Sequence, residues 1–329
     1  MPTTYPLLHD PAIFANLAVC LFGPPKTTGK SAVDGSPARE FLVLGECLAD
    51  GRAQLYETGV VGQLEIENLA DLDLFLQAGD MVKGGRQDRT LGADFIVPAR
   101  SGRMLVPAFC VEQGRWSERQ GESAAQFSSS EETLSSAKLK RVIRKERSQS
   151  AVWEEVAAVQ GKLEASVGSN VAAAASPSSL QLSMEDGAVR RRVEDYLAAF
   201  RALPEAHPDA VGFVFLVNGK PSGAEAYGTP VLFRKLWSKG LRAAAVEALG
   251  ERSHPDEDGD GKLIDRAEIA AWLAAPARRG SRAKISRRPV TDRVILQTRE
   301  TAAQIVFETL DAAQEDRCIH TSILAQQPG

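Results

Sequence analysis

The chain has 329 residues, of which 43% are hydrophobic and 25% are charged, and its formal net charge is −4. This composition is typical of a globular protein with enough residues for one large domain or two ordinary ones. Because the net charge is small and negative, no overall field attracts the chain to nucleic acid or to an anionic lipid surface. We expect neither partner.

No apolar run has the length that crossing a bilayer requires, and the first residues lack the basic and apolar regions of a secretory signal. The cysteines are far apart and form no Cys-x-x-Cys pair, which argues against a zinc ribbon and against a disulfide scaffold. They are Cys20, Cys47, Cys110 and Cys318. Reduced thiols are the simplest interpretation, and they predict a cytoplasmic location.

The first third of the chain alternates short apolar runs with proline and glycine, at the spacing of a meander or a small barrel. Residues 12–21 read as a strand or a short helix, and 41–48 read as a helix that ends near Asp50. Strand-like runs follow at 54–57, 62–67, 72–79, 94–98 and 104–111.

The composition changes after residue 116. The stretch 117–136 is rich in Ser, Gln and Glu and predicts a flexible loop, and 166–183 predicts a second one. Between them, 137–163 reads as a helix that begins with a basic run. We interpret that run as a solvated helix face, because no aromatic platform for nucleic acid accompanies it. An amphipathic helix is predicted at 185–203.

The run 211–217 predicts a buried strand, and the Asn218-Gly219 pair after it is the strongest short signal for a hairpin. Pro221 predicts that the return strand lies at or near a sheet edge. Thr229 and Pro230 predict the N-cap and first residue of a helix that runs to about residue 249. Further helices are predicted at 265–274 and 301–312, and strands at 294–297 and 319–324.

Strands cluster and helices cluster along the chain, so we expect an α+β fold rather than alternating α/β. A β-rich core, arranged as a meander, a small barrel or a sandwich, would carry a packed helical segment. We expect a flexible tail over 1–11 and a single composite domain over 12–329. That domain contains the two flexible stretches and an acidic loop at 256–268.

A glycine pair set among cations is the best clue to a binding site. Glycine permits positive φ and close approach of the backbone, and consecutive N–H groups beside arginines suit an anion such as phosphate. The residues that we expect to bind a ligand here are Lys83, Gly84, Gly85, Arg86, Gln87 and Arg89. The alternative is a solvated turn whose arginines pair with Asp80 and Asp88.

A second polar string follows the apolar run that ends at Cys110. Glu112 could act as a general base or could hold an arginine of the first string. We add Gln113, Arg115 and Trp116 to the predicted ligand-binding residues, with Trp116 stacking on a ring. The alternative is a strand end with a capping aromatic. Cys110 lies in an apolar run, where a small buried cysteine is common.

An acidic string between two predicted helices matches the first half of an EF-hand calcium loop, with Asp at positions 1, 3 and 5 and Gly at position 6. The second half departs, because position 12 is Ala267 and the acid comes one residue later. The predicted calcium ligands are Asp256, Asp258, Asp260, Lys262 and Glu268. The alternative is an acidic, solvated loop between helices.

The two strings also carry a resemblance. Gly84-Gly85-Arg86-Gln87-Asp88-Arg89 and Cys110-Val111-Glu112-Gln113-Gly114-Arg115-Trp116 resemble the ARG- and rhodanese-phosphatase-superfamily-associated protein domain family, and the likeness spans most of the chain. The family's name implies a link to NAD or ADP-ribose metabolism. Asp88 departs from the family's Lys-Gln-Asn-Arg-like string, which weakens the expectation that an amide reads a base there.

Three functions are therefore open. The chain binds a phosphate-bearing small molecule of the ADP-ribose or nucleotide type at the Gly/Arg string. Alternatively, the same pocket hydrolyses a glycosidic or phosphoester bond with Glu112 as base and Arg86 or Arg89 stabilising developing charge. In the third case the charged strings form an internal ion-pair network, and the domain is a non-catalytic protein-interaction domain.

Overall fold

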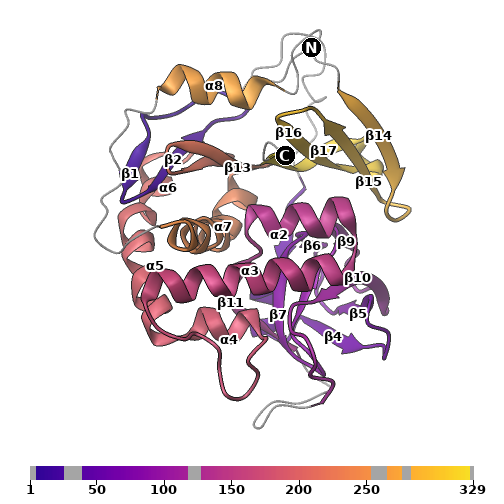
Figure 1. Ribbon diagram of the computed structural model, residues 1–329. Coiled ribbons are helices and arrows are strands. Elements are labelled where there is room, and N and C mark those ends of the chain that lie inside the picture. Colours follow the sequence, from indigo (N-terminus) through magenta and orange to yellow (C-terminus); the bar gives the residue numbers. More distant parts are fainter. Residues whose placement is uncertain (1–4, 26–38, 118–126, 253–264, 276–282, 327–329) are drawn as a thin grey trace. The chain divides into compact units, whose positions relative to one another are not determined.

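The computed structural model describes residues 5–25, 39–117, 127–252, 265–275 and 283–326, and for 129–133 it describes the backbone alone. The chain forms two compact units (Figure 1). Unit 1 combines Met1–Arg39, Tyr196–Ser238 and Glu257–Gly329, and unit 2 combines Glu40–Asp195 and Lys239–Asp256. Each unit brings together segments that are distant in sequence.

Unit 1 is built on an eight-stranded antiparallel sheet in the order β1-β2-β12-β13-β17-β16-β15-β14. Its strands are β1 (Ala12–Phe14), β2 (Leu17–Phe22), β12 (Gly212–Val217), β13 (Lys220–Tyr227), β14 (Lys284–Pro289), β15 (Val294–Glu300), β16 (Gln304–Asp311) and β17 (Arg317–Ala325). Its helical segments include α6 (Leu203–Ala206), α8 (Arg266–Ala274) and the short turn Ala312–Gln314.

Every residue of β2 and β12 is buried, because side chains cover both faces of the sheet at its centre. Ile269 of α8 belongs to the apolar cluster that contains Val214 on one face. Phe213, which points to the opposite face, meets Trp237 edge to face at 5.2 Å. This explains why 211–217 reads as a continuous apolar run instead of an alternating one.

The predicted hairpin at Asn218-Gly219 is confirmed, since both residues have positive φ, 52° and 72°. The prediction that Pro221 marks a strand near a sheet edge is wrong, because β13 lies between β12 and β17. Pro221 is tolerated because it sits where the β12–β13 register shifts, and β17 pairs with β13 from Gly223 onwards.

The helix predicted at 301–312 is wrong, because 304–311 forms strand β16. The signal that misled the prediction is real at the atomic level: Thr301 Oγ1 accepts a hydrogen bond from the backbone N–H of Gln304 at 3.1 Å, as an N-cap would. Thr301 N–H also donates to the Gln304 carbonyl at 2.8 Å, which closes a turn between β15 and β16. The same side-chain bond serves caps and turns, and strand pairing on both sides decides between them.

The N-terminal stretch predicted as a flexible tail contains residues that are bonded to the sheet. Leu8 N–H donates to the Leu21 carbonyl at 2.9 Å, Leu7 is buried, and Leu21 N–H donates to Nε2 of His9 at 3.0 Å. Residues 6–9 therefore run along β2.

Unit 2 contains a six-stranded sheet in the order β11-β7-β8-β10-β5-β4 and a three-stranded sheet in the order β3-β6-β9. The strands are β3 (Leu42–Val43), β4 (Ala53–Glu57), β5 (Gln63–Asn68), β6 (Leu74–Leu76), β7 (Asp80–Gly84), β8 (Arg89–Leu91), β9 (Phe95–Val97), β10 (Met104–Cys110) and β11 (Phe127–Leu134). The larger sheet curls into a nearly closed barrel, because its two end strands, β11 and β4, contact each other. Strand β11 falls inside the stretch 117–136 predicted as a flexible loop.

The helices of unit 2 are α1 (Leu44–Ala49), α2 (Ala137–Arg141), a π-helical turn (Val142–Glu146), α3 (Gln149–Val167) and α4 (Leu180–Glu185). Two helices, α5 (Gly187–Phe200) and α7 (Pro230–Gly250), contribute residues to both units. The predicted N-cap of α7 is confirmed, since Leu232 N–H donates to Oγ1 of Thr229 at 3.1 Å. The helix predicted at 41–48 is wrong in its first residues, which form β3.

The basic run at the start of α2 is not a wholly solvated face. Lys140 and Arg144 are buried, and an Arg144 guanidinium nitrogen lies 3.4 Å from a carboxylate oxygen of Asp94. The π-helical turn accounts for the error in part, because it changes which residues of the run share a face relative to a regular α-helix.

The structure confirms the α+β class with a β-rich core. The cysteines of the described residues are free. None of the described helices combines the length and the apolar character that crossing a bilayer requires. The expectation of a single composite domain stays a prediction.

His9 predicts a pH dependence of stability. Its Nε2 accepts from Leu21 and its Nδ1 lies 2.5 Å from the Asp10 carbonyl, so the neutral ring satisfies both contacts. Burial lowers the pKa of His9 below 6.5, and the charge of His207 lowers it further. Below pH 6.5, His9 therefore binds more protons in the unfolded chain than in the folded one. Its contribution to the free energy of unfolding is complete above pH 6.5 and is lost as the pH falls through the folded-state pKa.

We expect the melting temperature difference between the wild type and His9→Gln to shrink as the pH is lowered from 7.5 to 5. Thermal unfolding of both proteins at several pH values measures this. A difference that is constant over the range would contradict the assignment.

Candidate functional site

The Gly/Arg string forms the hairpin turn between β7 and β8. Gly84 and Gly85 have positive φ, 118° and 57°, as the sequence predicts for a tight turn. Only glycine fits at position 85, because a Cβ atom there would lie 2.3 Å from Cζ of Phe127 on β11. The two glycines therefore permit a turn that packs closely on an aromatic ring.

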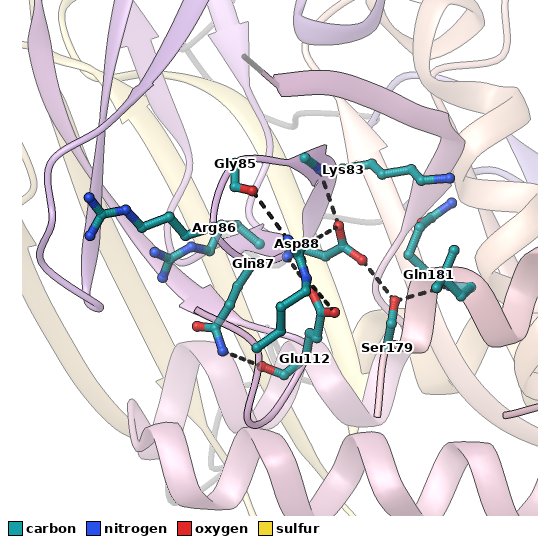
Figure 2. A network of polar contacts seen from close by, with 12 residues as sticks. Lys83, Gly85, Arg86, Gln87, Asp88, Glu112, Ser179 and Gln181 are labelled. Carbon is teal, nitrogen blue, oxygen red and sulfur yellow. Dashed lines mark hydrogen bonds and ion pairs between the residues drawn. The ribbon is translucent and has the colours of Figure 1, made fainter. Parts of the chain in front are cut away.

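The carboxylate of Asp88, at the end of this turn, accepts a backbone N–H of the glycine pair, the kind of donor that the sequence prediction assigned to an anion. Asp88 is fully buried, and its Oδ1 accepts the backbone N–H of Gly84 at 3.2 Å. Its Oδ2 accepts the hydroxyl of Ser179 at 2.7 Å. Figure 2 shows Asp88 at the centre of these contacts. The Gly84 N–H is thus bonded to a side chain of the same turn.

Glu112 of the second string lies beside Asp88 and is held by an arginine. Arg115 donates from Nε and from a terminal nitrogen to the two oxygens of Glu112, both at 2.7 Å. The backbone N–H of Asp88 adds a third bond at 3.0 Å, and Gln87 donates to the Glu112 carbonyl at 2.9 Å (Figure 2). We call Gly84, Gln87, Asp88, Glu112, Arg115 and Ser179 the hairpin network.

The electrostatics of Glu112 suit a structural carboxylate. Burial by itself would raise its pKa, but hydrogen bonds from Arg115, from Ser176 and from the Asp88 backbone together hold the pKa of Glu112 below its usual range. A general base is most effective when its pKa is near the working pH. Of the two roles that the sequence left open, the geometry favours holding an arginine, although that arginine belongs to the second string.

Arg89 is also paired inside the protein. Its guanidinium lies 3.1 Å from a carboxylate oxygen of Glu57, and it donates to the Val61 carbonyl at 2.6 Å and to Sγ of Cys110 at 2.7 Å. Burial raises the pKa of the Cys110 thiol to about 11, which disfavours the thiolate that a nucleophilic cysteine requires. Arg89 has no exposed donor with which to meet a ligand.

Three predicted residues lie on the outer rim of this arrangement. Arg86 and Gln113 are exposed, and Trp116 is 40% exposed. The guanidinium carbon of Arg86 lies 5.6 Å from the centre of the Trp116 ring, and that of Arg89 lies 5.5 Å from it. Lys83, by contrast, is paired with Glu185 of α4 at 2.7 Å. We call Arg86, Gln113 and Trp116 the rim.

The sequence prediction missed the partners that complete the network. Ser176, Ser178 and Ser179 come from the stretch 166–183 predicted as flexible. Ser179 caps α4 by accepting Leu182 N–H at 3.1 Å and donates its own proton to Asp88. Ser178 donates to the Gln113 carbonyl and accepts the Gln113 N–H. A serine before the apolar pair Leu180 and Leu182 is an N-cap signal that could have located the start of α4.

The predicted calcium loop cannot be placed, because Asp256, Asp258, Asp260 and Lys262 lie outside the described residues. Glu268 is exposed in the first turn of α8. Within the described ranges, no group of three or more His, Cys, Asp or Glu side chains is arranged to hold a metal ion.

The comparison with family models agrees with the resemblance of the two strings. The model of the ARG and Rhodanese-Phosphatase-superfamily-associated Protein domain matches residues 8–324. The chain belongs to this family. The match covers segments of both units and includes the whole hairpin network. No curated protein and no solved structure matches the chain.

The network predicts a large difference between two neighbouring arginines. Arg115→Ala removes the partner of Glu112 and leaves a buried carboxylate unpaired, which is expected to destabilise unit 2 by about 3–5 kcal/mol. Arg86→Ala removes an exposed side chain that makes no ion pair with a described residue, and it should change the free energy of unfolding by less than about 0.5 kcal/mol. Chemical denaturation of both variants measures this.

The second replacement Glu112→Gln in the Arg115→Ala background should recover part of the loss, because it removes the unpaired charge. If Arg115→Ala were no more damaging than Arg86→Ala, the ion pair would not stabilise the fold.

Proposed function

We propose that this family member is a non-catalytic binding domain that holds a phosphate-bearing small molecule of the ADP-ribose or nucleotide type on its rim. The observation that carries the proposal is the difference between the cations of the two strings. Lys83, Arg89 and Arg115 are each paired with a carboxylate, whereas the Arg86 guanidinium is exposed and makes no ion pair with any described residue.

The rim supplies the two chemistries that such a ligand needs. A guanidinium offers parallel N–H groups that match two oxygens of a phosphate. An exposed indole offers a face on which a base or another ring stacks, and the neighbouring cations strengthen its interaction with an electron-rich partner. Gln113, which is exposed and lies three positions before Trp116 in the chain, adds an amide that can donate and accept. The family's name, which refers to an association with ARG and rhodanese-phosphatase proteins, agrees with a ligand of this kind.

Hydrolysis by Glu112 has less support. Both of its oxygens are bonded to Arg115, its pKa is lowered, and the side chain is buried. We expect that the wild type turns over neither ADP-ribose nor NAD, and that Glu112→Gln leaves ligand affinity unchanged. Product analysis by chromatography tests this, and turnover in the wild type that Glu112→Gln abolishes would favour the enzyme.

A protein-interaction role is favoured by one further observation. Val60 and Val61 are exposed in the turn after β4, and the Val61 carbonyl accepts from Arg89, whose guanidinium lies against Trp116. Trp is enriched among the energetic centres of protein interfaces, and Trp116 is exposed whereas Arg89 is buried beneath it. If the small-molecule proposal fails, this surface is the next candidate.

The proposal predicts that Arg86→Ala and Trp116→Ala each weaken binding of ADP-ribose, NAD or a nucleotide at least tenfold, or about 1.4 kcal/mol. Neither should change the melting temperature of the free protein by much, since both side chains lie at the surface. Isothermal titration calorimetry with the full chain measures the affinities.

Arg100→Ala is the matched control. Arg100 is an exposed arginine of the same unit that pairs with exposed Asp71, so its loss should not alter affinity. Absence of wild-type binding to all of these ligands, or equal weakening by Arg100→Ala, would refute the assignment.

A further inference from the structure

The charged residues of the two strings, taken together with their carboxylate partners, contain as many acids as cations. The strings read alone are cationic, but their partners Glu57 and Glu185 come from other segments. The complete set is Lys83, Arg86, Arg89, Arg115, Glu57, Asp88, Glu112 and Glu185. Its formal charge is zero, so it offers a polyanion no general attraction.

Most cations of this set are committed to carboxylates of the same chain. Lys83 lies 2.7 Å from an oxygen of Glu185, and Arg115 donates to both oxygens of Glu112 at 2.7 Å. The side chain of Arg89 is fully buried in its own ion pair. A ligand phosphate could recruit one of these cations only by leaving its carboxylate without that partner, which is costly where the pair is buried.

Arg86 is the exposed cation of this set that makes no ion pair with a described residue. Figure 2 shows the side chains of Lys83 and Arg86 extending in opposite directions from the turn, so Lys83 does not add a second cation beside Arg86. A guanidinium matches two oxygens of one phosphate. The described part of the rim therefore has donors for a single phosphate group.

The rim is also small. The guanidinium carbon of Arg86 lies 5.6 Å from the centre of the Trp116 ring. A ligand that places its phosphate on Arg86 and stacks a ring on Trp116 needs only a short linker between the two groups. A nucleoside monophosphate has this arrangement, because one sugar joins its base to its one phosphate.

We propose that the rim recognises a nucleoside monophosphate by its base and its single phosphate, and that further phosphates add little affinity. This inference rests on the proposed function and narrows its ligand class. The added phosphates of a nucleoside diphosphate or triphosphate, and the second phosphate of ADP-ribose or NAD, would find no further unpaired cation in the set. Stacking is available to every base, so it does not by itself select one.

The test is isothermal titration calorimetry of the full chain with adenosine, AMP, ADP and ATP, and with the corresponding guanine, cytosine and uracil compounds. A metal chelator is present, so that magnesium does not change the charge of the longer phosphates. For the base that binds best, we expect the monophosphate to bind at least about tenfold more tightly than the nucleoside. The diphosphate and triphosphate should bind within about threefold of the monophosphate.

Two variants separate the phosphate contact from the ring contact. Arg86→Ala should bind the nucleoside and the monophosphate equally, and Arg86→Lys should restore part of the preference, because a lysine keeps the charge but loses the planar fork. Trp116→Ala should weaken both ligands by the same factor and leave the preference unchanged. Arg100→Ala, at an exposed arginine paired with Asp71, is the matched control and should behave as the wild type.

The outcomes distinguish this inference from the proposed function. Affinity that rises about tenfold or more with each added phosphate, or ADP-ribose or NAD binding about tenfold more tightly than every monophosphate, would overturn the inference and leave the proposed function standing. A preference for the monophosphate that survives in Arg86→Ala would also overturn it. Binding of no nucleotide, no ADP-ribose and no NAD would refute the proposed function itself, and the inference with it.

Discussion

The site depends on ion pairs and hydrogen bonds within the chain that neutralise the charged side chains around the β7–β8 hairpin. Arg115 holds Glu112 through two short bonds, and the Asp88 backbone donates to the same carboxylate while the Asp88 side chain closes the glycine turn. Removing charges from water is costly unless they are paired and hydrogen-bonded, and here each carboxylate oxygen has a described donor. The turn, the strand end after β10 and the start of α4 are joined by these few bonds, so none of them can be repositioned alone.

This neutralisation changes the meaning of a cationic, glycine-bearing string. A row of arginines beside glycines suggests an anion receptor, but the receptor is occupied by carboxylates of the same chain. What remains accessible is the rim, where Arg86 and Trp116 lie together at the surface. The physical distinction is between charges that fix a backbone, which must be buried and paired, and charges that meet a ligand, which must keep free donors.

The curl of the six-stranded sheet shapes the surroundings of the site. It brings Phe127 of β11 against the Gly85 turn, where a Cβ atom would lie 2.3 Å from Cζ of the ring. The same curl places β11 and α1 against β4 at the other end of the sheet. The hairpin network is therefore fixed by the sheet on which it lies, and only the rim stays exposed.

Local sequence determined the features that depend on neighbours in the chain. The positive φ of Gly84 and Gly85, the turn at Asn218-Gly219, the Thr229 cap and the burial of 211–217 follow from conformational preference and hydrophobic pattern. Tertiary structure decided the rest. Strand β16 formed where a local cap signal predicted a helix, because ladders on both sides outweigh one side-chain bond. Arg89 pairs with Glu57, which is 32 positions away, and Asp88 accepts from Ser179, which is 91 positions away. The linear sequence does not specify which distant side chain reaches each charged group, because the packing of the elements brings them together.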